Sequence, residues 1–222
     1  MRTIAFVTQK GGSGKSTLAS SLAVAAREAG EKVFIVDMDP QASLMKWAKT
    51  RADAEMPVAA VSAGKLAAAL AVMEKKGVTL VIIDTPGNDS GEAKAAMKAA
   101  DLCVIPARPN VFDLWASELT RKTLKEMRRE FVFLLNQCPP AQQSARVEQG
   151  AKALEAMGGL ITPLIAACVD YQEAARHGLG VTELRGSGAA AEDMRKLWTS
   201  VKKRMAKGSA AKGKSVPAKK AA

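Results

Sequence analysis

Short apolar segments recur along the chain, and segments with helical periodicity separate them. The apolar segments are rich in Val, Ile, Leu and Phe without polar alternation, as in strands buried on both faces of a parallel sheet. They occupy residues 3–8, 32–37, 79–84, 101–106, 131–136 and, with a weaker pattern, 160–165. The helical segments lie at about 15–29, 42–54, 63–76, 91–99, 113–130 and 143–157. This alternation predicts a doubly wound α/β fold, a mostly parallel sheet with helices on both faces.

A last helix is predicted at about 189–206. Its apolar positions form one stripe between basic residues, and the stripe consists of Leu197, Trp198, Val201 and Met205;. The following residues are Ala, Lys, Gly, Ser and Pro, with Val216 as the only large apolar side chain. Such a segment cannot bury enough surface to order itself. We therefore expect one folded domain over residues 1–206 and a basic, disordered tail over residues 207–222.

Length and composition fit a single cytoplasmic domain. The chain has 222 residues, of which 48% are hydrophobic and 25% charged;. No apolar run approaches the roughly 20 residues that span a bilayer, and no signal-peptide pattern precedes Thr3;. The three cysteines are scattered, at Cys103, Cys138 and Cys168. Reduced, packed thiols are favoured over a disulfide or a metal site.

Charge is distributed unevenly along the chain. The 33 Lys and Arg against 22 Asp and Glu give a net charge of +11. Ten of the basic residues and none of the acidic ones lie from Arg195 onward, which leaves residues 1–194 with a balance of only +1. A terminal segment of one sign is typical of an arm that binds a polyanion. A merely solubilising tail is the alternative.

A glycine-rich loop follows the first predicted strand and precedes the first predicted helix. Residues 9–17 read Gln-Lys-Gly-Gly-Ser-Gly-Lys-Ser-Thr. Glycines let the backbone wrap so that its N–H groups point at phosphate oxygens, and the helix N-terminus adds its positive end. Lys15 is placed for the β and γ phosphates, and the Ser16 hydroxyl for Mg²⁺. The predicted nucleotide-binding residues of the loop are Gly11, Gly12, Ser13, Gly14, Lys15, Ser16 and Thr17.

The loop departs from the usual G-x-x-x-x-G-K-[ST] pattern at its start. Gln9 stands at the first glycine position, and Lys10 follows it. The form K-G-G-x-G-K-[ST] resembles the deviant loop of the ParA/MinD family of ATPases. In that family the early lysine reaches across a dimer interface to the partner's nucleotide. The resemblance therefore implies a homodimer that sandwiches two ATP molecules, with Lys10 as a catalytic residue.

Two further motifs look like the switches of that family. A D-x-D-P-Q motif begins at Asp37, and an apolar strand ends at Asp84 before Thr-Pro-Gly87. The resemblance implies that Asp39 orients or deprotonates the attacking water and that Asp37 lies near the water shell of the metal. It also implies that Asp84 binds a magnesium-bound water and that the Gly87 amide contacts the γ phosphate. Phosphoryl transfer needs this positioning and charge compensation, not a covalent nucleophile.

The resemblance covers about residues 3–185 and is weaker beyond 140. Asn136 is similar to the family asparagine that reads the adenine edge. The later adenine-contacting loop is left unassigned, because this sequence has Ala166-Ala167 where many relatives carry a basic residue. Other segments look like the small ParA subgroup, which lacks an N-terminal DNA-binding domain. These segments are Ser43-Leu44-Met45-Lys46-Trp47, Ile105-Pro106, Pro109 and Asp113-Leu114.

The favoured function is a positioning ATPase associated with the nucleoid. Its ATP-bound dimer would hold DNA without sequence preference, and an adaptor or centromere-binding protein would trigger hydrolysis and release. The cargo could be a plasmid, a chemoreceptor cluster or a microcompartment. The predicted DNA-binding residues are Arg195, Lys196, Lys202, Lys203 and Arg204;. A second basic face, either a DNA contact or a solvated helix face, consists of Arg121, Lys122, Lys125, Arg128 and Arg129.

Two other readings compete with this one. In a MinD-like membrane ATPase the apolar stripe of the last helix would enter the lipid interface. Against that reading, the chain continues into a polar tail, and core packing explains the stripe more simply. A small-molecule kinase or ligase on the same loop has little use for Lys10, and an electron-donating reductase would need cluster cysteines at defined places. The lone His177 is interpreted as a surface residue.

Overall fold

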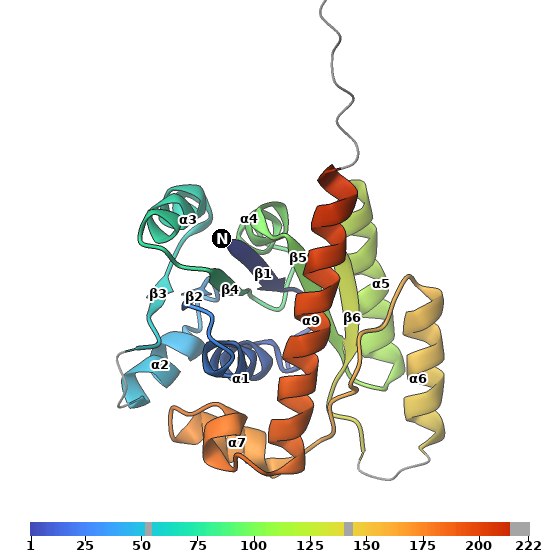
Figure 1. Cartoon of the computed structure of the whole chain (residues 1–222). Coiled ribbons are helices and arrows are strands. Elements are labelled where there is room, and N and C mark those ends of the chain that lie inside the picture. Colours follow the sequence, from blue (N-terminus) through green and yellow to red (C-terminus); the bar gives the residue numbers. More distant parts are fainter. Residues whose placement is uncertain (52–54, 140–143, 214–222) are drawn as a thin grey trace, which may run out of the picture.

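A computed structural model describes residues 1–51, 55–139 and 144–213, with side chains as far as Lys207. Six parallel strands form one sheet in the order β3-β2-β4-β1-β5-β6 (Figure 1). The strands are β1 Arg2–Phe6, β2 Val33–Asp37, β3 Val58–Ala60, β4 Leu80–Asp84, β5 Leu102–Ala107 and β6 Phe131–Leu135. The predicted fold class is confirmed, and five of the six strands lie where the apolar segments predicted them.

Helices cover both faces of the sheet. They are α1 Lys15–Glu28, α2 Ser43–Thr50, α3 Leu66–Lys75, α4 Gly91–Ala99, α5 Val111–Glu126, α6 Ala145–Ala156, α7 Val169–Arg176, α8 Val181–Leu184 and α9 Ala189–Gly213. On one face Ile4 and Phe6 pack with side chains of α1, α2, α7, α8 and α9. On the other face Ala5 and Val7 pack with side chains of α3, α4, α5 and α6. The strands read as continuous apolar runs because alternate residues enter two different cores.

The predicted strand at 160–165 is wrong. This segment makes only isolated bridges to the sheet, Phe133 with Leu160 and Cys138 with Ala166. Gly158 and Gly159 turn the chain through left-handed conformations just before it;. Pro163 inside the segment has no N–H for a ladder;. The sixth strand is instead β3 at the opposite edge of the sheet, three residues that the apolar pattern did not predict.

The apolar stripe of the last helix is core, as the simpler reading predicted. Leu197 and Val201 have no exposed surface, and Trp198 and Met205 keep only 4% and 8%. They pack against α1 and the sheet. The membrane reading needed this stripe on the surface, so its burial removes that support. The helix α9 runs to Gly213, beyond the predicted end at 206, and residues 214–222 of the predicted tail lie outside the described residues.

The cysteines differ in burial, and the histidine lies at the surface. All three cysteines fall in the described part of the chain as free thiols, with Cys103 and Cys138 buried. Burial raises the pKa of the Cys138 thiol to about 11, which makes it unreactive;. His177 is exposed. None of the described helices is both long and apolar enough to cross a membrane.

Candidate functional site

The glycine-rich loop leaves β1 at the carboxyl edge of the sheet and enters α1 at Lys15. Gly12 and Gly14 adopt left-handed backbone conformations, with φ of 76° and 92°. Gly14 precedes α1 without a side-chain cap, so the first N–H groups of this helix remain available for an anion;. The loop therefore has the geometry of a phosphate cradle.

Two cavities flank this cradle. The larger, of about 930 Å³, lies between the loop, the Asp39–Ser43 segment, Gly87 and α7. The smaller, of about 380 Å³, lies on the other side of Gly14 and Thr17 and is closed by residues 166–169. A triphosphate bound in the cradle would therefore have room on both sides of the loop. The Ala166-Ala167 segment, which the sequence left unassigned, borders the smaller cavity.

Lys15 is a buried cation inside the loop. Its side chain is 7% exposed, and its Nζ donates a hydrogen bond to the Lys10 carbonyl at 3.4 Å. Burial lowers the pKa of Lys15, while the nearby carboxylates of Asp84 and Asp39 oppose that shift. A buried ammonium whose hydrogen bond among the described residues is a long one to a carbonyl suits an anion, and binding of the phosphates by Lys15 stays a prediction;.

Asp84 is the most deeply buried carboxylate of the site. Strand register places it beside both Phe6 on β1 and Asp37 on β2. Its Oδ2 accepts a hydrogen bond from Ser16 Oγ at 2.5 Å, and its Oδ1 is buried without a hydrogen-bond partner among the described residues. Burial raises the pKa of Asp84 to about 7, with the Ser16 hydrogen bond opposing the shift. The surrounding residues therefore supply less positive charge than the ionised Asp84 carboxylate needs to be stable when buried.

The unpartnered oxygen of Asp84 and the Ser16 hydroxyl fit a magnesium ion. Mg²⁺ takes oxygen ligands and is commonly held by one or two carboxylates together with waters and substrate phosphates. The described residues contain no group of three or more His, Cys, Asp or Glu that could hold a metal without phosphate. The residues present therefore fit an ion that arrives with a nucleotide.

Asp37 and Asp39 shape the loop that precedes α2. Asp37 Oδ2 accepts from the backbone N–H groups of Leu44 and Met45 at 2.9 and 3.0 Å, so it caps α2 from a distance. Its Oδ1 accepts from the Asp39 amide at 3.1 Å. Because both oxygens bind backbone, the placement of Asp37 near the metal's water shell stays a prediction. Asp39 is partly exposed on the wall of the larger cavity, and its Oδ1 accepts from the Gln41 amide at 2.9 Å.

Gly87 touches the backbone of the phosphate loop. A Cβ atom built on Gly87 would lie 3.0 Å from both Cα and N of Gly11, so only glycine fits without displacing the loop. The preceding Thr85 is anchored to the strand, because its Oγ1 donates to the Phe6 carbonyl at 2.8 Å. The segment after β4 therefore packs directly against the phosphate loop.

Asn136 supports the loop from the side of β6. Its Nδ2 donates to the Ser13 carbonyl at 2.8 Å, and a Cβ atom on Gly14 would lie 2.4 Å from this nitrogen. The neighbouring Gln137 donates from Nε2 to the Gly12 carbonyl at 3.3 Å. Asn136 borders the smaller cavity, and its contact with the adenine stays a prediction.

Sequence reasoning missed the residues that hold the site from outside. Arg108 donates from Nε and Nη2 to the buried carboxylate of Asp113 at 3.0 and 3.1 Å, and its Nη1 lies beside Gly12. These two residues are five apart across the β5–α5 turn, and only Asp113 of the pair belongs to the segments that look like the small ParA subgroup. No local sequence signal marks Arg108 as a residue that contacts the phosphate loop while bonded to Asp113.

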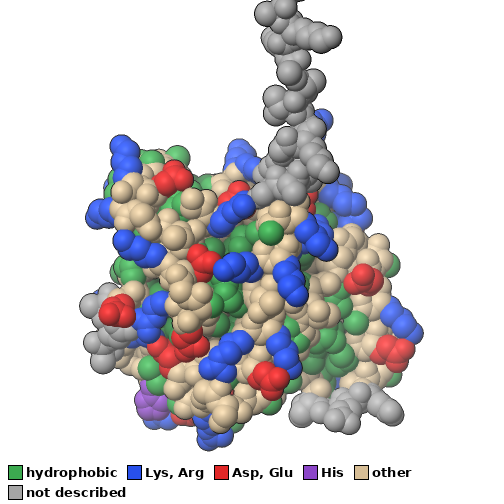
Figure 2. Space-filling model, in the orientation of Figure 1, with side chains coloured by type: hydrophobic (Ala, Val, Ile, Leu, Met, Phe, Trp, Pro, Cys, Tyr) green, Lys and Arg blue, Asp and Glu red, His purple; other side chains and the backbone are tan. Residues whose placement is uncertain are grey.

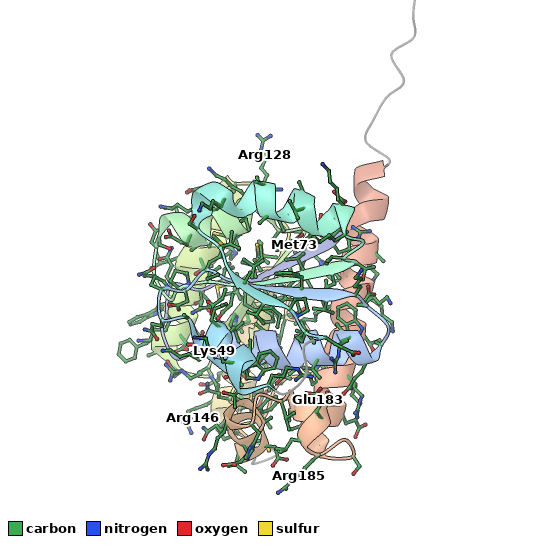
Figure 3. The ribbon with its side chains drawn as sticks, turned by 90° about the vertical axis from the view of Figure 1, so that its left-hand side faces the viewer. Lys49, Met73, Arg128, Arg146, Glu183 and Arg185 are labelled. Atoms are coloured by element: carbon green, nitrogen blue, oxygen red, sulfur yellow. The ribbon has the colours of Figure 1, made fainter. Side chains whose placement is uncertain are left out.

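The helix after the Asp37–Asp39 loop is fastened to the C-terminal part of the chain. Trp47 Nε1 donates to the Leu179 carbonyl at 3.1 Å. Arg51 is buried, pairs with Glu183 at 2.5 Å and donates to the Gly178 carbonyl at 3.0 Å. Glu183 lies on the side of the sheet that α1 covers (Figure 3). Contacts between residues more than 120 positions apart could not be read from the sequence.

This arrangement defines a P-loop nucleotide-binding protein with a deviant phosphate loop. The chain belongs to the family described as CobQ/CobB/MinD/ParA nucleotide binding domain, whose family model matches residues 4–205. Members of this family are P-loop ATPases, so the chain has the fold and site of a nucleotide-hydrolysing family.

Two curated relatives cover most of the chain. The maintenance of carboxysome distribution protein A of Gloeobacter kilaueensis is 33% identical over 198 residues, which cover 85% of this chain and 87% of the relative. The protein of the same name from Halothiobacillus neapolitanus is 28% identical over 200 residues, covering 86% and 91%. A Cyanothece McdA variant solved as an ATP complex shares the fold, with a TM-score of 0.70, 17% identity and coverage of 93% and 96%.

Lys15→Ala tests the phosphate cradle. Loss of the buried ammonium should weaken ATP binding by at least about 100-fold, because charge-assisted hydrogen bonds contribute about 1.5–3 kcal/mol each. Isothermal titration calorimetry with a nonhydrolysable ATP analogue measures this affinity. Lys49→Ala, an exposed lysine of α2 away from the cavity, is the matched control and should bind normally. Normal affinity in Lys15→Ala would refute the site.

Asp84→Asn tests the charge deficit. The folded-state pKa of about 7 lies above the ordinary value of 3.8, so the metal-free protein should lose stability as pH rises from about 4 through 7;. The neutral variant should melt several degrees higher than wild type at pH 8, and the difference should shrink as pH falls and vanish only below about pH 4;. Differential scanning calorimetry without Mg²⁺ measures both. A pH-independent difference would contradict the buried charge, while weaker Mg²⁺-dependent ATP binding by the variant would support the metal assignment.

Proposed function

We propose that this chain is a ParA-like positioning ATPase. ATP joins two copies into a sandwich dimer, the dimer holds DNA without sequence preference, and an adaptor protein stimulates hydrolysis and release. The observation that carries the proposal is a complete phosphate site with a second lysine, Lys10, at its rim. The names of the two carboxysome distribution relatives support a protein microcompartment as cargo, ahead of a plasmid or a chemoreceptor cluster.

The residues of the site divide the work of phosphoryl transfer. Lys15 and the first amides of α1 hold the β and γ phosphates. Ser16 and Asp84 hold Mg²⁺, which neutralises charge on the phosphate oxygens when bound. Asp39 orients a water toward the γ phosphorus and accepts its proton. The water oxygen bonds to the γ phosphorus while the bond from that phosphorus to the bridging oxygen breaks, and ADP and inorganic phosphate result.

Lys10 is the residue that requires a second copy. Its carbonyl faces inward, where it accepts from Lys15 Nζ and Ser13 Oγ, while its side chain is partly exposed. The Lys10 ammonium has no ion-pair partner within the described ranges. In the proposed dimer it reaches the γ phosphate bound by the other protomer, where it compensates charge in the transition state. Hydrolysis therefore waits for dimerisation.

The predicted DNA-binding residues of α9 lie on the surface beside acidic groups. Figure 2 shows blue and red side chains interspersed over this helix. Four of the five predicted residues pair with glutamates, namely Arg195 with Glu28, Lys196 with Glu192, Lys202 with Glu31 and Arg204 with Glu130. Exposed ion pairs contribute only about 0–1 kcal/mol, so DNA phosphates can displace them. Lys203 has no ion-pair partner among the described residues, and the sequence has no Asp or Glu after Arg195.

The second basic face is more constrained than the sequence suggested. Arg121 donates to the Met157 carbonyl and pairs with Glu118, and Arg129 donates to the Lys98 carbonyl. Arg128, at the end of α5, projects away from the molecule (Figure 3). This face therefore keeps a smaller set of free cations and ranks behind α9 as a DNA surface.

A ligase reading stays within the family, because the family description includes CobQ and CobB. It leaves Lys10 without a role. The two relatives that cover most of this chain are named for distributing carboxysomes, and this favours positioning over small-molecule chemistry.

Asp39→Ala should trap the ATP-bound dimer. The change spares the phosphate cradle and removes the group that handles the water, so turnover should fall by about 10²–10⁴-fold. Analytical ultracentrifugation with ATP and a phosphate-release assay measure the two effects. Lys10→Ala is the contrasting variant, since it should bind nucleotide as a monomer and form no dimer. Wild-type turnover in Asp39→Ala would move catalysis elsewhere, with Asp37 and Asp84 the next candidates.

Removal of residues 207–222 should weaken DNA binding. Each neutralised phosphate contributes about 0.9 log units of affinity per log unit of salt, so losing the lysines should also flatten the salt dependence. Lys203→Glu should weaken binding as well, and the exposed Lys65→Glu on the opposite side of the fold should not. Fluorescence anisotropy with duplex DNA at several salt concentrations measures this, with ATP affinity as the control. If neither change affects DNA binding, the Arg121–Arg129 face is the next surface to test.

A further inference from the structure

Helix α5 exposes a stripe of large apolar side chains. Six large hydrophobic residues are exposed in the described part of the chain, and four of them lie on α5. The remaining two, Val72 and Val169, lie on α3 and α7. The α5 stripe consists of Val111, Phe112, Trp115 and Leu119, with exposed fractions of 48%, 65%, 63% and 56%. The rings of Phe112 and Trp115 meet edge to face at 5.7 Å between centroids.

This stripe lies opposite the face that α5 packs against the sheet. The buried positions of the helix are Asp113, Ala116, Ser117, Thr120 and Leu124. At 3.6 residues per turn the four apolar side chains project about half a turn away from that set. A helix that is apolar on its solvent face marks a surface for another molecule.

Helix α5, which carries the stripe, is fastened to the phosphate loop. α5 follows β5, so its first turns lie at the same edge of the sheet as the loop (Figure 1). The Gln9 amide, one residue before Lys10, donates to Thr120 Oγ1 on α5 at 3.2 Å. Arg108, just before the helix, reaches the loop at Gly12. Helix α5 is therefore joined to the loop at the residue before Lys10, the lysine that the proposed dimer needs at its interface.

The loop itself offers little apolar surface for an interface between two copies. The rim around Lys10 is made of Gly11 and Gly12, which offer backbone and little apolar surface. A stable protein interface buries about 1,200–2,000 Å² in total, with an apolar core inside a polar rim. In a two-fold dimer the same patch serves both partners, so a stripe next to Lys10 is presented twice.

We propose that the α5 stripe is the apolar core of the interface with a second copy of this chain, formed when ATP is bound. This inference rests on the proposed function, because it assigns the surface that completes the ATP sandwich. Glu118 and Arg121, paired at 2.9 Å beside Leu119, supply the polar rim. The stripe is left open in the monomer, and the dimer covers it.

Trp115 is a native probe of this surface. All three tryptophans lie in the described part of the chain, and Trp115 alone is exposed, since Trp47 and Trp198 are 5% and 4% exposed. Iodide quenches exposed indole and not buried indole. A nonhydrolysable ATP analogue should therefore abolish most iodide quenching in the wild type. Quenching should persist in Lys10→Ala, which binds the analogue without dimerising, and in either protein without nucleotide.

Trp115→Ser/Leu119→Ser tests the stripe directly. The double variant should weaken the ATP-dependent dimer by at least about 100-fold in sedimentation, because two large apolar side chains contribute about 1.5–3 kcal/mol each when buried. Its analogue affinity as a monomer and its melting temperature should stay unchanged, since both side chains are exposed. Val72→Ser, exposed to a similar degree on α3, is the matched control and should dimerise normally.

The outcomes separate this inference from the proposed function. A wild-type chain that stays monomeric with ATP would overturn both. If wild type and the double variant dimerise equally, the stripe assignment is wrong while the ATP sandwich stands. Unchanged iodide quenching of a demonstrated wild-type dimer would overturn it in the same way, and would leave the stripe to an adaptor protein.

Discussion

The carboxylate of Asp84 is buried at the edge of the sheet with less positive charge around it than it needs. One oxygen is bonded to the Ser16 hydroxyl, and the other has no partner among the described residues. Lys15 is also buried, with one long hydrogen bond to a carbonyl. Burying two such groups costs folding free energy that packing elsewhere must offset. In the proposed function a magnesium nucleotide would supply both missing partners at once, and the rest of the site surrounds these two residues.

The strand order connects the buried Asp84 carboxylate to the rest of the site. β4 lies between β1 and β2, so Asp84 is in register with the start of the phosphate loop and with Asp37. Asp37 caps α2, and α2 is tied through Trp47 and Arg51 to the segment before α9. Gly87, in the segment after β4, packs against Gly11 of the phosphate loop. A change at the nucleotide therefore reaches α2 and the C-terminal helices through direct contacts.

The two faces of the sheet carry helices with different exposed surfaces. On the α1 side of the sheet, α9 buries its apolar stripe and presents paired charges to solvent, which suits a weak and reversible contact with a polyanion. On the opposite side, α5 buries small and polar residues and presents aromatic ones. The two helices therefore expose different chemistry although both are amphipathic, and only the second is joined to the phosphate loop by a hydrogen bond.

The sequence by itself determined the fold class, five strands, the phosphate loop and the acidic residues at the strand ends, because these depend on local patterns and backbone requirements. It did not determine β3, whose three residues pair only because β2 offers an edge, and it wrongly predicted a strand at 160–165. The sequence showed the apolar stripe of α9 but not how deeply that stripe is buried. It did not reveal the exposed stripe of α5, because the residues of that stripe look like ordinary helix core. Which apolar face meets the sheet is decided by packing between distant segments, and a single chain's local pattern carries no record of that choice.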